Sequence, residues 1–147
     1  MTAEDSFEVV VVGGGVVGAA LARALRGASV ALVAEPPAGP PAQTEKFDAR
    51  VYAISPGNVA FLSQLGAWQQ LAPERLTPVH AMRVYGDDGD SLIEFDAYAA
   101  GASELAWIVE DARLQDALWR GLETWRMKAT QASTRMVCST PNAPEMP

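Results

Sequence analysis

The sequence predicts an α/β fold in which helices flank a parallel β-sheet. Residues 8–12, which are continuously apolar from Val9 onward, predict a short strand of the kind that is buried on both faces of a parallel sheet. A glycine-rich turn at residues 13–18 follows at once, and apolar residues then recur at helical spacing as far as Gly27, a suitable C-cap. A second apolar segment at residues 29–34 completes a strand–helix–strand unit, which predicts a right-handed crossover between parallel strands.

The next part of the chain predicts a loop, a short strand and a helix. Residues 36–43 are rich in proline and glycine and are not expected to form regular structure, whereas residues 49–54 are extended. Ser55 and Pro56 mark a helix start, because serine is a good N-cap and proline fits the first helical position. The apolar stripe of this helix consists of Val59, Leu62 and Leu65, and Gly66 ends it.

A β-hairpin and a strand–helix pair follow. Within residues 82–95, two apolar segments flank an Asp-Gly turn at residues 87–90, a pattern typical of a hairpin. Residues 106–109 predict another strand, and the acidic residues 110–111 supply a helix start suited to the helix dipole. The packed face of that helix consists of Leu114, Leu118 and Leu122.

The tail from Thr124 onward has a different composition. It holds three of the five methionines and the single cysteine, Cys138. Neither a strand period nor a helix period persists beyond about residue 130. We therefore expect residues 124–147 to be an unpatterned and mostly disordered tail.

Composition and charge exclude several functions. The net charge of −7 and the absence of a lysine or arginine cluster argue against nucleic-acid binding. One cysteine and one histidine, His80, allow neither a disulfide framework nor a Cys/His metal site, so we predict no metal. The apolar run at residues 9–22 is shorter than the roughly 20 residues of a membrane span, so no transmembrane segment is predicted. These features predict a soluble, cytoplasmic protein.

The glycine-rich turn, Gly13-Gly14-Gly15-Val16-Val17-Gly18, predicts a dinucleotide-binding site. In such a turn the first glycine allows a tight bend, the second lets a pyrophosphate approach the backbone, and the third lets the helix pack closely on the sheet. The start of the helix supplies free N–H groups and partial positive charge to the phosphates. Glu35, which ends the next strand, is placed to bind ribose hydroxyls, so FAD or NAD is favoured over a 2′-phosphorylated cofactor.

Three later segments resemble the FAD-dependent aromatic-ring monooxygenases of class A. They are residues 48–56 (DARVYAISP), 61–66 (FLSQLG) and 107–114 (WIVEDARL), and they follow the glycine-rich turn in the order of that family. Within the family the chain is most similar to the ubiquinone-biosynthesis hydroxylases, over residues 7 to about 123. The resemblance implies that the chain is the N-terminal part of a Rossmann-like FAD-binding domain.

The resemblance also implies roles for two arginines. Arg50 matches a family arginine near the phosphates or ring of the flavin, and Arg113 matches one that reaches the ribityl–phosphate region. Arginine suits both roles because its planar guanidinium donates two hydrogen bonds to a phosphate. Two alternatives stay open: Arg50 is a surface residue paired with Asp48, or Arg113 forms a salt bridge with Glu110. Trp68, Trp107 and Trp119 are expected to serve in packing rather than in stacking on a cofactor.

The activity that the resemblance implies belongs to the full-length family. In that family NAD(P)H reduces FAD, and O2 is then used to hydroxylate a small aromatic substrate. Two further flavin elements of the family, a mid-chain Asp-Gly motif and a late Gly-Asp motif, do not occur in this sequence. We therefore expect a truncated segment that is not catalytic alone. The alternative is a non-catalytic remnant or a small module that binds NAD-type or ADP-type ligands.

The resemblance divides the chain into four parts. Residues 1–77 belong to the FAD-binding domain, residues 78–109 are a partial substrate-domain β segment, residues 110–123 are a helix that returns to the FAD domain, and the tail follows. The hairpin would then be part of an incomplete substrate-binding sheet. Apolar faces left without their partners predict association through exposed surface. Peripheral membrane association is a further expectation for the full-length family.

Overall fold

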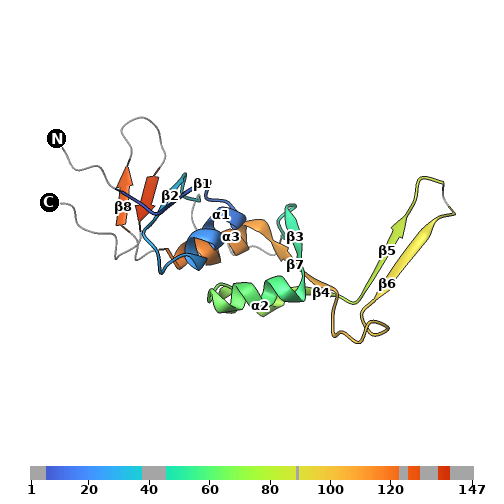
Figure 1. Cartoon of the computed structure of the whole chain (residues 1–147). Coiled ribbons are helices and arrows are strands. Elements are labelled where there is room, and N and C mark those ends of the chain that lie inside the picture. The colour runs from blue at the N-terminus through green and yellow to red at the C-terminus, as the bar shows by residue number, and fades with distance from the viewer. Residues whose placement is uncertain (1–5, 38–45, 89, 123–125, 130–135, 140–147) are drawn as a thin grey trace, which may run out of the picture.

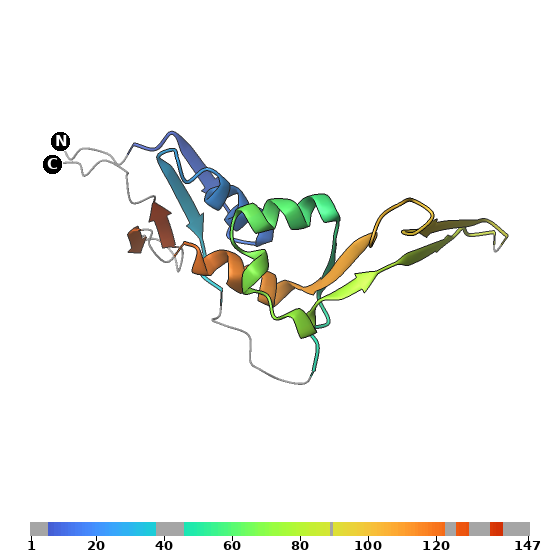
Figure 2. The same ribbon diagram turned by 90° about the horizontal axis from the view of Figure 1, so that it is seen from below.

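The computed structural model describes residues 6–37, 46–88, 90–122, 126–129 and 136–139. A body built of three helices and two small sheets carries a long hairpin that projects from one end (Figures 1 and 2).

The first sheet begins with the predicted strand–helix–strand unit. Strands β1 (Val9–Val12) and β2 (Val30–Ala34) are parallel, with Val9 opposite Val30, and helix α1 (Val16–Ala24) connects them. The parallel α/β arrangement is therefore confirmed. The prediction that Gly27 caps the helix is wrong, because α1 ends at Ala24 and is followed by tight turns in which Arg26 donates to the carbonyl of Arg23.

Two further strands complete this sheet in the order β1-β2-β9-β8. Strands β8 (Arg126–Ala129) and β9 (Met136–Ser139) form an antiparallel pair, and β9 is also antiparallel to β2. This differs from the expectation of an unpatterned tail, since β9 lies beyond residue 130. The physical reason is that the edge of β2 away from β1 carries backbone groups that need partners, and even a short strand supplies them. The rest of the tail lies outside the described residues, as does most of the predicted loop at residues 36–43.

The second sheet joins segments that are far apart in the chain. Its order is β3-β7-β4, with β7 (Ala106–Glu110) antiparallel to both β3 (Val51–Ile54) and β4 (Thr77–Val79). Helix α2 (Pro56–Gln64) follows β3, and the Oγ of Ser55 accepts a hydrogen bond from the backbone N–H of Asn58 (3.4 Å), as the N-cap prediction requires. The 3₁₀ turns η1 (Trp68–Gln70) and η2 (Pro73–Arg75) lead to β4.

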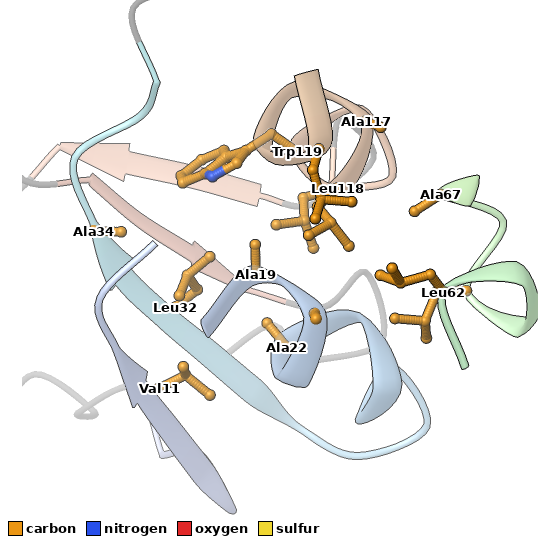
Figure 3. Packing of buried hydrophobic residues seen from close by; sticks show 14 of the residues in the cluster. Val11, Ala19, Ala22, Leu32, Ala34, Leu62, Ala67, Ala117, Leu118 and Trp119 are labelled. Atoms are coloured by element: carbon orange, nitrogen blue, oxygen red, sulfur yellow. The ribbon is translucent and has the colours of Figure 1, made fainter. Parts of the chain in front are cut away.

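Helix α3 (Asp111–Arg120) packs against α1 and anchors the core. The three leucines that were predicted to form its packed face are almost fully buried. The hydrophobic cluster lies between α1, α3, β2 and the end of α2 (Figure 3). Its members include Val11, Ala19, Ala22, Leu32, Leu62, Leu114, Leu118 and Trp119.

Arg23 of α1 connects the three helices. Its guanidinium donates to the carbonyl oxygens of Ala117 (3.0 Å) and Leu118 (3.3 Å) in the last turn of α3, and to the carbonyl of Leu65 after α2. A Cβ at Gly121 would overlap this guanidinium, so a larger residue there would displace the Arg23 side chain. One cation therefore satisfies carbonyl groups at two helix ends, where the helix dipole is negative.

The predicted hairpin is present as β5 (Ala81–Tyr85) and β6 (Leu92–Asp96), which are antiparallel with Tyr85 opposite Leu92. At its tip the carboxylate of Asp88 accepts hydrogen bonds from the backbone N–H (2.9 Å) and the hydroxyl (2.7 Å) of Ser91. All residues of both strands are exposed.

Candidate dinucleotide-binding site

The glycine-rich turn joins β1 to α1, and its geometry requires glycine at two positions. Gly13 has φ of 106°, a left-handed conformation that side chains disfavour, and its N–H donates to the carbonyl of Val33 on β2 (2.9 Å). A Cβ at Gly18 would overlap the carbonyl oxygen of Gly13. The turn can therefore fold back on the first turn of α1 because neither residue has a side chain.

Gly15 faces open space. It is the N-cap of α1, and no atom lies within 4 Å of the position that its Cβ would take. Its carbonyl accepts the first helical hydrogen bond, from Ala19 (2.9 Å). The N–H groups of Val16, Val17 and Gly18 precede that bond and have no backbone acceptor among the described residues. The free, positively polarised helix end thus borders on a position where a ligand can approach the backbone.

Gly14, in the middle of the turn, packs against the protein. A Cβ there would lie 2.6 Å from Cβ of Ala34 and 2.6 Å from Cζ2 of Trp119. The Nε1–H of Trp119 donates to the carbonyl oxygen of Gly14 (2.8 Å), and Nε2 of Gln115 donates to the same oxygen at 3.4 Å. Helix α3 therefore holds the turn through one carbonyl group.

Glu35 lies at the same sheet edge as the turn. It directly follows β2, and β1 and β2 are parallel, so their carboxyl ends meet at this edge. Its side chain is exposed. Val17, in the first turn of α1, is 81% exposed, whereas Val16 packs against the core. The structure thus brings the glycine-rich turn and the predicted ribose acid to one open edge.

Arg50 precedes β3 and does not form the predicted alternative pair with Asp48. Its side chain is 72% exposed, and its guanidinium pairs through Nε with Oδ2 of Asp111 (3.3 Å) and donates through Nη2 to the hydroxyl of Tyr52 (3.2 Å). The carboxylate of Asp48 accepts the backbone N–H of Arg50 instead (3.0 Å). The hydrogen bond to Tyr52 and the charge of Asp111 raise the pKa of Arg50, so the residue is cationic at all relevant pH values.

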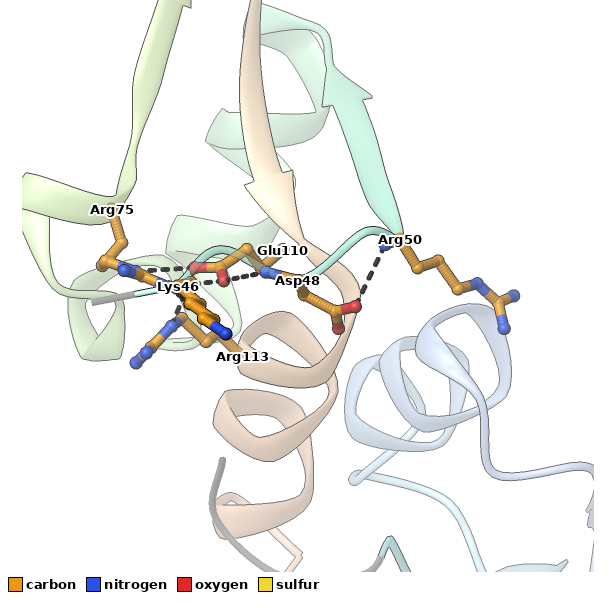
Figure 4. Close-up of polar contacts among 6 residues, drawn as sticks. All are labelled: Lys46, Asp48, Arg50, Arg75, Glu110 and Arg113. Carbon is orange, nitrogen blue, oxygen red and sulfur yellow. Dashed lines mark hydrogen bonds and ion pairs between the residues drawn. The ribbon is translucent and has the colours of Figure 1, made fainter. Parts of the chain in front are cut away.

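Glu110, the last residue of β7, is the centre of a buried polar cluster (Figure 4). It is 4% exposed and accepts hydrogen bonds from Arg75 (2.8 Å from Nε and 2.6 Å from Nη2), from Nε of Arg113 (2.8 Å) and from the backbone N–H of Asp48 (2.7 Å). Burial alone would raise the pKa of Glu110. The hydrogen bonds from Arg75 and Asp48 and the charges of the two arginines outweigh burial and hold that pKa below its ordinary value.

Arg113 therefore forms the salt bridge that was the alternative to a cofactor contact. The pair uses Nε of Arg113, whose side chain is 19% exposed. Figure 4 draws Arg113 and Arg75 on one side of the start of α3 and Arg50 on the other side. The structure does not gather the two predicted arginines on one face, and a cofactor contact by either of them stays a prediction.

Arg75 and Gln115 were not singled out from the sequence, and Trp119 was expected only to pack. Arg75 fixes the segment before Arg50, because its Nη2 donates to the carbonyl of Lys46 (3.0 Å) and its guanidinium lies 4.0 Å from the ring centre of Phe47. Its partner Glu110 is 35 residues away in the chain, and Trp119 and Gln115 are more than 100 residues from Gly14. No local sequence pattern predicts such contacts. The position of Trp119 directly after Leu118 in α3 was a signal that its ring is buried.

The residues that the structure describes also bear on two other kinds of site, a metal centre and a membrane span. No group of three or more potential metal ligands occurs among those residues. None of the described helices is both long enough and apolar enough to cross a membrane.

Comparison with known proteins identifies relatives of one kind. The chain is 34% identical to the ubiquinone biosynthesis monooxygenase COQ6 of Danio rerio, over 82% of this chain and 26% of that protein. It is 36% identical to the human protein of the same name, over 80% of this chain and 26% of the human protein. It is also 33% identical to the 3-demethoxyubiquinol 3-hydroxylase of Escherichia coli K12, over 79% and 30%. The chain thus spans less than a third of the length of these relatives. No family model matches it.

Two solved structures share the fold of this chain. The p-nitrophenol 4-monooxygenase PnpA of Pseudomonas putida DLL-E4 superposes with a TM-score of 0.51 at 22% identity, over 78% of this chain and 28% of that enzyme. The peptidyl tryptophan dihydroxylase QhpG superposes with a TM-score of 0.50 at 18% identity, over 97% of this chain and 34% of that enzyme. At these identities the likeness concerns the fold. The sequence relationships show that this chain is a homologue of the ubiquinone biosynthesis monooxygenase COQ6 and of 3-demethoxyubiquinol 3-hydroxylase, over less than a third of their length.

Proposed function

We propose that the edge formed by the glycine-rich turn and Glu35 binds the ADP part of FAD. The observation that carries this proposal is the open position at Gly15, which borders on the free N–H groups at the start of α1. A pyrophosphate would accept hydrogen bonds from these groups, and the helix dipole would favour its negative charge. Glu35 would accept hydrogen bonds from the ribose hydroxyls.

The two arginines would act farther along the cofactor. Arg50 is exposed and held by Asp111 and Tyr52, so its remaining donors would be directed toward a phosphate or the flavin. The ion pair of Arg113 with Glu110 uses Nε, and its two terminal nitrogens would serve as donors to the ribityl–phosphate region.

The activity of the complete relatives suggests the reaction in which this segment takes part. We propose that it is the cofactor-binding segment of a hydroxylase that uses NAD(P)H and O2 on the aromatic ring of a ubiquinone precursor. FAD supplies the redox chemistry, whereas this chain binds and orients the ADP part. The substrate proposal rests on the activities of the relatives, the ubiquinone biosynthesis monooxygenases and 3-demethoxyubiquinol 3-hydroxylase.

A titration tests the proposal against its alternative, a remnant or module that binds NAD-type or ADP-type ligands. Calorimetry with FAD, NAD and ADP should show that FAD and ADP bind and that FAD binds more tightly than NAD. Preference for NAD would indicate a different oxidoreductase module. No binding of any of the three would indicate a remnant that has lost its ligand.

Gly15→Val is the variant that tests the site most directly. The backbone of Gly15 is extended and its Cβ position is empty, so the fold should tolerate valine, yet the side chain would occupy the path of the pyrophosphate. We expect the affinity for FAD and ADP to fall by at least about tenfold, whereas the poorer N-cap should lower the free energy of unfolding by only about 1 kcal/mol. Gly27→Ala is the matched control, since its Cβ position is also empty and lies after α1. Unchanged FAD affinity in Gly15→Val would contradict the proposed site.

A further inference from the structure

We infer that Trp119 is a positioning residue for the phosphate-binding turn, acting through its hydrogen bond to the carbonyl oxygen of Gly14. This inference rests on the proposed function and names a residue that the glycine pattern does not include. Trp119 lies near the end of α3, is buried, and is separated from Gly14 by 105 residues in the chain.

The carbonyl groups of the turn explain why such a residue is needed. A carbonyl oxygen is the negative end of the peptide dipole, so a turn that binds phosphate must direct its carbonyl groups away from the ligand. The carbonyl of Gly13 packs against Gly18, and that of Gly15 accepts the first hydrogen bond of α1 from Ala19. The carbonyl of Gly14 has no backbone donor among the described residues.

Side chains of α3 supply the missing donors. The Nε1–H of Trp119 lies 2.8 Å from the Gly14 oxygen, and Nε2 of Gln115 approaches the same atom at 3.4 Å. The indole ring also occupies the space where a Cβ of residue 14 would lie. The middle glycine of the turn is thus the residue that lets Trp119 come close enough to bind its carbonyl. With that carbonyl bound to α3, the N–H groups of the following residues face the open side.

Removal of this donor should affect phosphate binding more than folding. Trp119→Phe keeps most of the buried aromatic surface and removes the N–H group. Incorporation of β-(3-benzothienyl)alanine at position 119 keeps the full indole shape and replaces N–H by sulfur, so it serves if the phenylalanine variant does not fold. In both we expect the affinity for ADP and FAD to fall by about five- to twentyfold, the size of one lost hydrogen bond or slightly more. The affinity for adenosine, which lacks phosphate, should stay within about twofold.

Trp107→Phe is the matched control. Trp107 lies on β7, away from the turn, and is partly buried. It packs edge-to-face on Trp68, with the two ring centres 6.2 Å apart. It should leave the affinities for ADP and adenosine unchanged. Amide hydrogen exchange of the peptide that spans residues 12–18 should increase in Trp119→Phe and not in the control, whether or not a ligand is present.

The possible results separate this inference from the proposed function. If the wild-type chain binds ADP and the two variants at position 119 bind it equally well, the positioning role is wrong and the proposed function stands. If ADP and adenosine lose affinity equally, Trp119 acts on stability alone, and the inference is wrong. If the wild-type chain binds neither ADP nor FAD, the proposed function fails and this inference fails with it.

Discussion

Glu110 is the residue on which the position of the segment before β3 depends. It accepts a hydrogen bond from the backbone N–H of Asp48, while Arg75 binds both Glu110 and the carbonyl of Lys46. Asp48 in turn accepts the N–H of Arg50. A single buried carboxylate therefore orders the backbone that presents Arg50.

Glu110→Gln should destabilise the protein by roughly 3 kcal/mol at pH 7, because it leaves Arg75 and Arg113 without their shared counter-charge. Glu94→Gln is the control, since Glu94 pairs with Arg83 on the exposed hairpin and its loss should cost less than about 1 kcal/mol. Urea unfolding of the three proteins measures both effects. Equal losses in the two variants would contradict a special role of Glu110.

The same carboxylate predicts a pH dependence of stability. Because the pKa of folded Glu110 lies below its unfolded value, its contribution is complete above the unfolded pKa of about 4.3 and is lost as the pH falls through the folded pKa. The free energy of unfolding of the wild-type protein should therefore decrease below about pH 4 more steeply than that of Glu110→Gln. Parallel pH profiles would show that the Glu110 pKa is not lowered in the folded state.

At the level of elements, the three helices depend on Arg23 for their junction. Its guanidinium is partly buried and donates to carbonyl groups at the ends of α2 and α3, which have no helical partner. The positive charge of Arg23 also interacts favourably with the negative C-terminal ends of both helix dipoles.

Arg23→Met should lower the free energy of unfolding by about 2–3 kcal/mol, since the aliphatic part stays and at least two carbonyl groups lose their donor. Arg26→Met, at an exposed position after α1, should change it by less than about 0.5 kcal/mol. Thermal unfolding monitored by circular dichroism at 222 nm compares the two variants. A loss of similar size in both would indicate a general charge effect instead.

At the level of the whole molecule, apolar surface is exposed on two parts. On the outer side of the first sheet Val12 is 75% exposed, and on the hairpin Met82, Val84, Ile93 and Phe95 lie on one face of a two-stranded sheet that nothing covers among the described residues. Contiguous patches of this kind promote association. Association through this exposed apolar surface stays a prediction.

Val84→Thr combined with Ile93→Thr, two residues that are directly opposite each other on the hairpin, should reduce self-association of the chain. Each side chain would contribute about 1.5 kcal/mol when buried in a contact, so the association constant should fall at least tenfold. Sedimentation velocity over a concentration series measures it. Tyr98→Thr is the control, because Tyr98 is exposed after β6 and outside this pair. An unchanged constant would place the association elsewhere.

Much of the fold was predictable because its rules are local. Ser55 and Pro56 start α2 by interactions within one helical turn, and the leucines of α3 recur at a spacing that defines one face. The end of α1 before Gly27 was not predictable in this way. Arg23 at that end donates hydrogen bonds to carbonyl groups of α3 and after α2, and these contacts depend on tertiary packing. Strand β9 was also missed, since its place depends on the open edge of β2 more than on its own residues.

By itself the sequence determined the strand–turn–helix unit, the glycines at positions 13, 15 and 18, and the acidic residue at the end of β2, because each follows from backbone geometry within a few residues. The tertiary structure alone decided which contacts surround that unit. It placed Trp119 on the carbonyl of Gly14, engaged Arg113 with Glu110, and added Arg75 to that cluster. Such pairs are brought together by packing of segments far apart in the chain, and no short-range pattern encodes the distance between them.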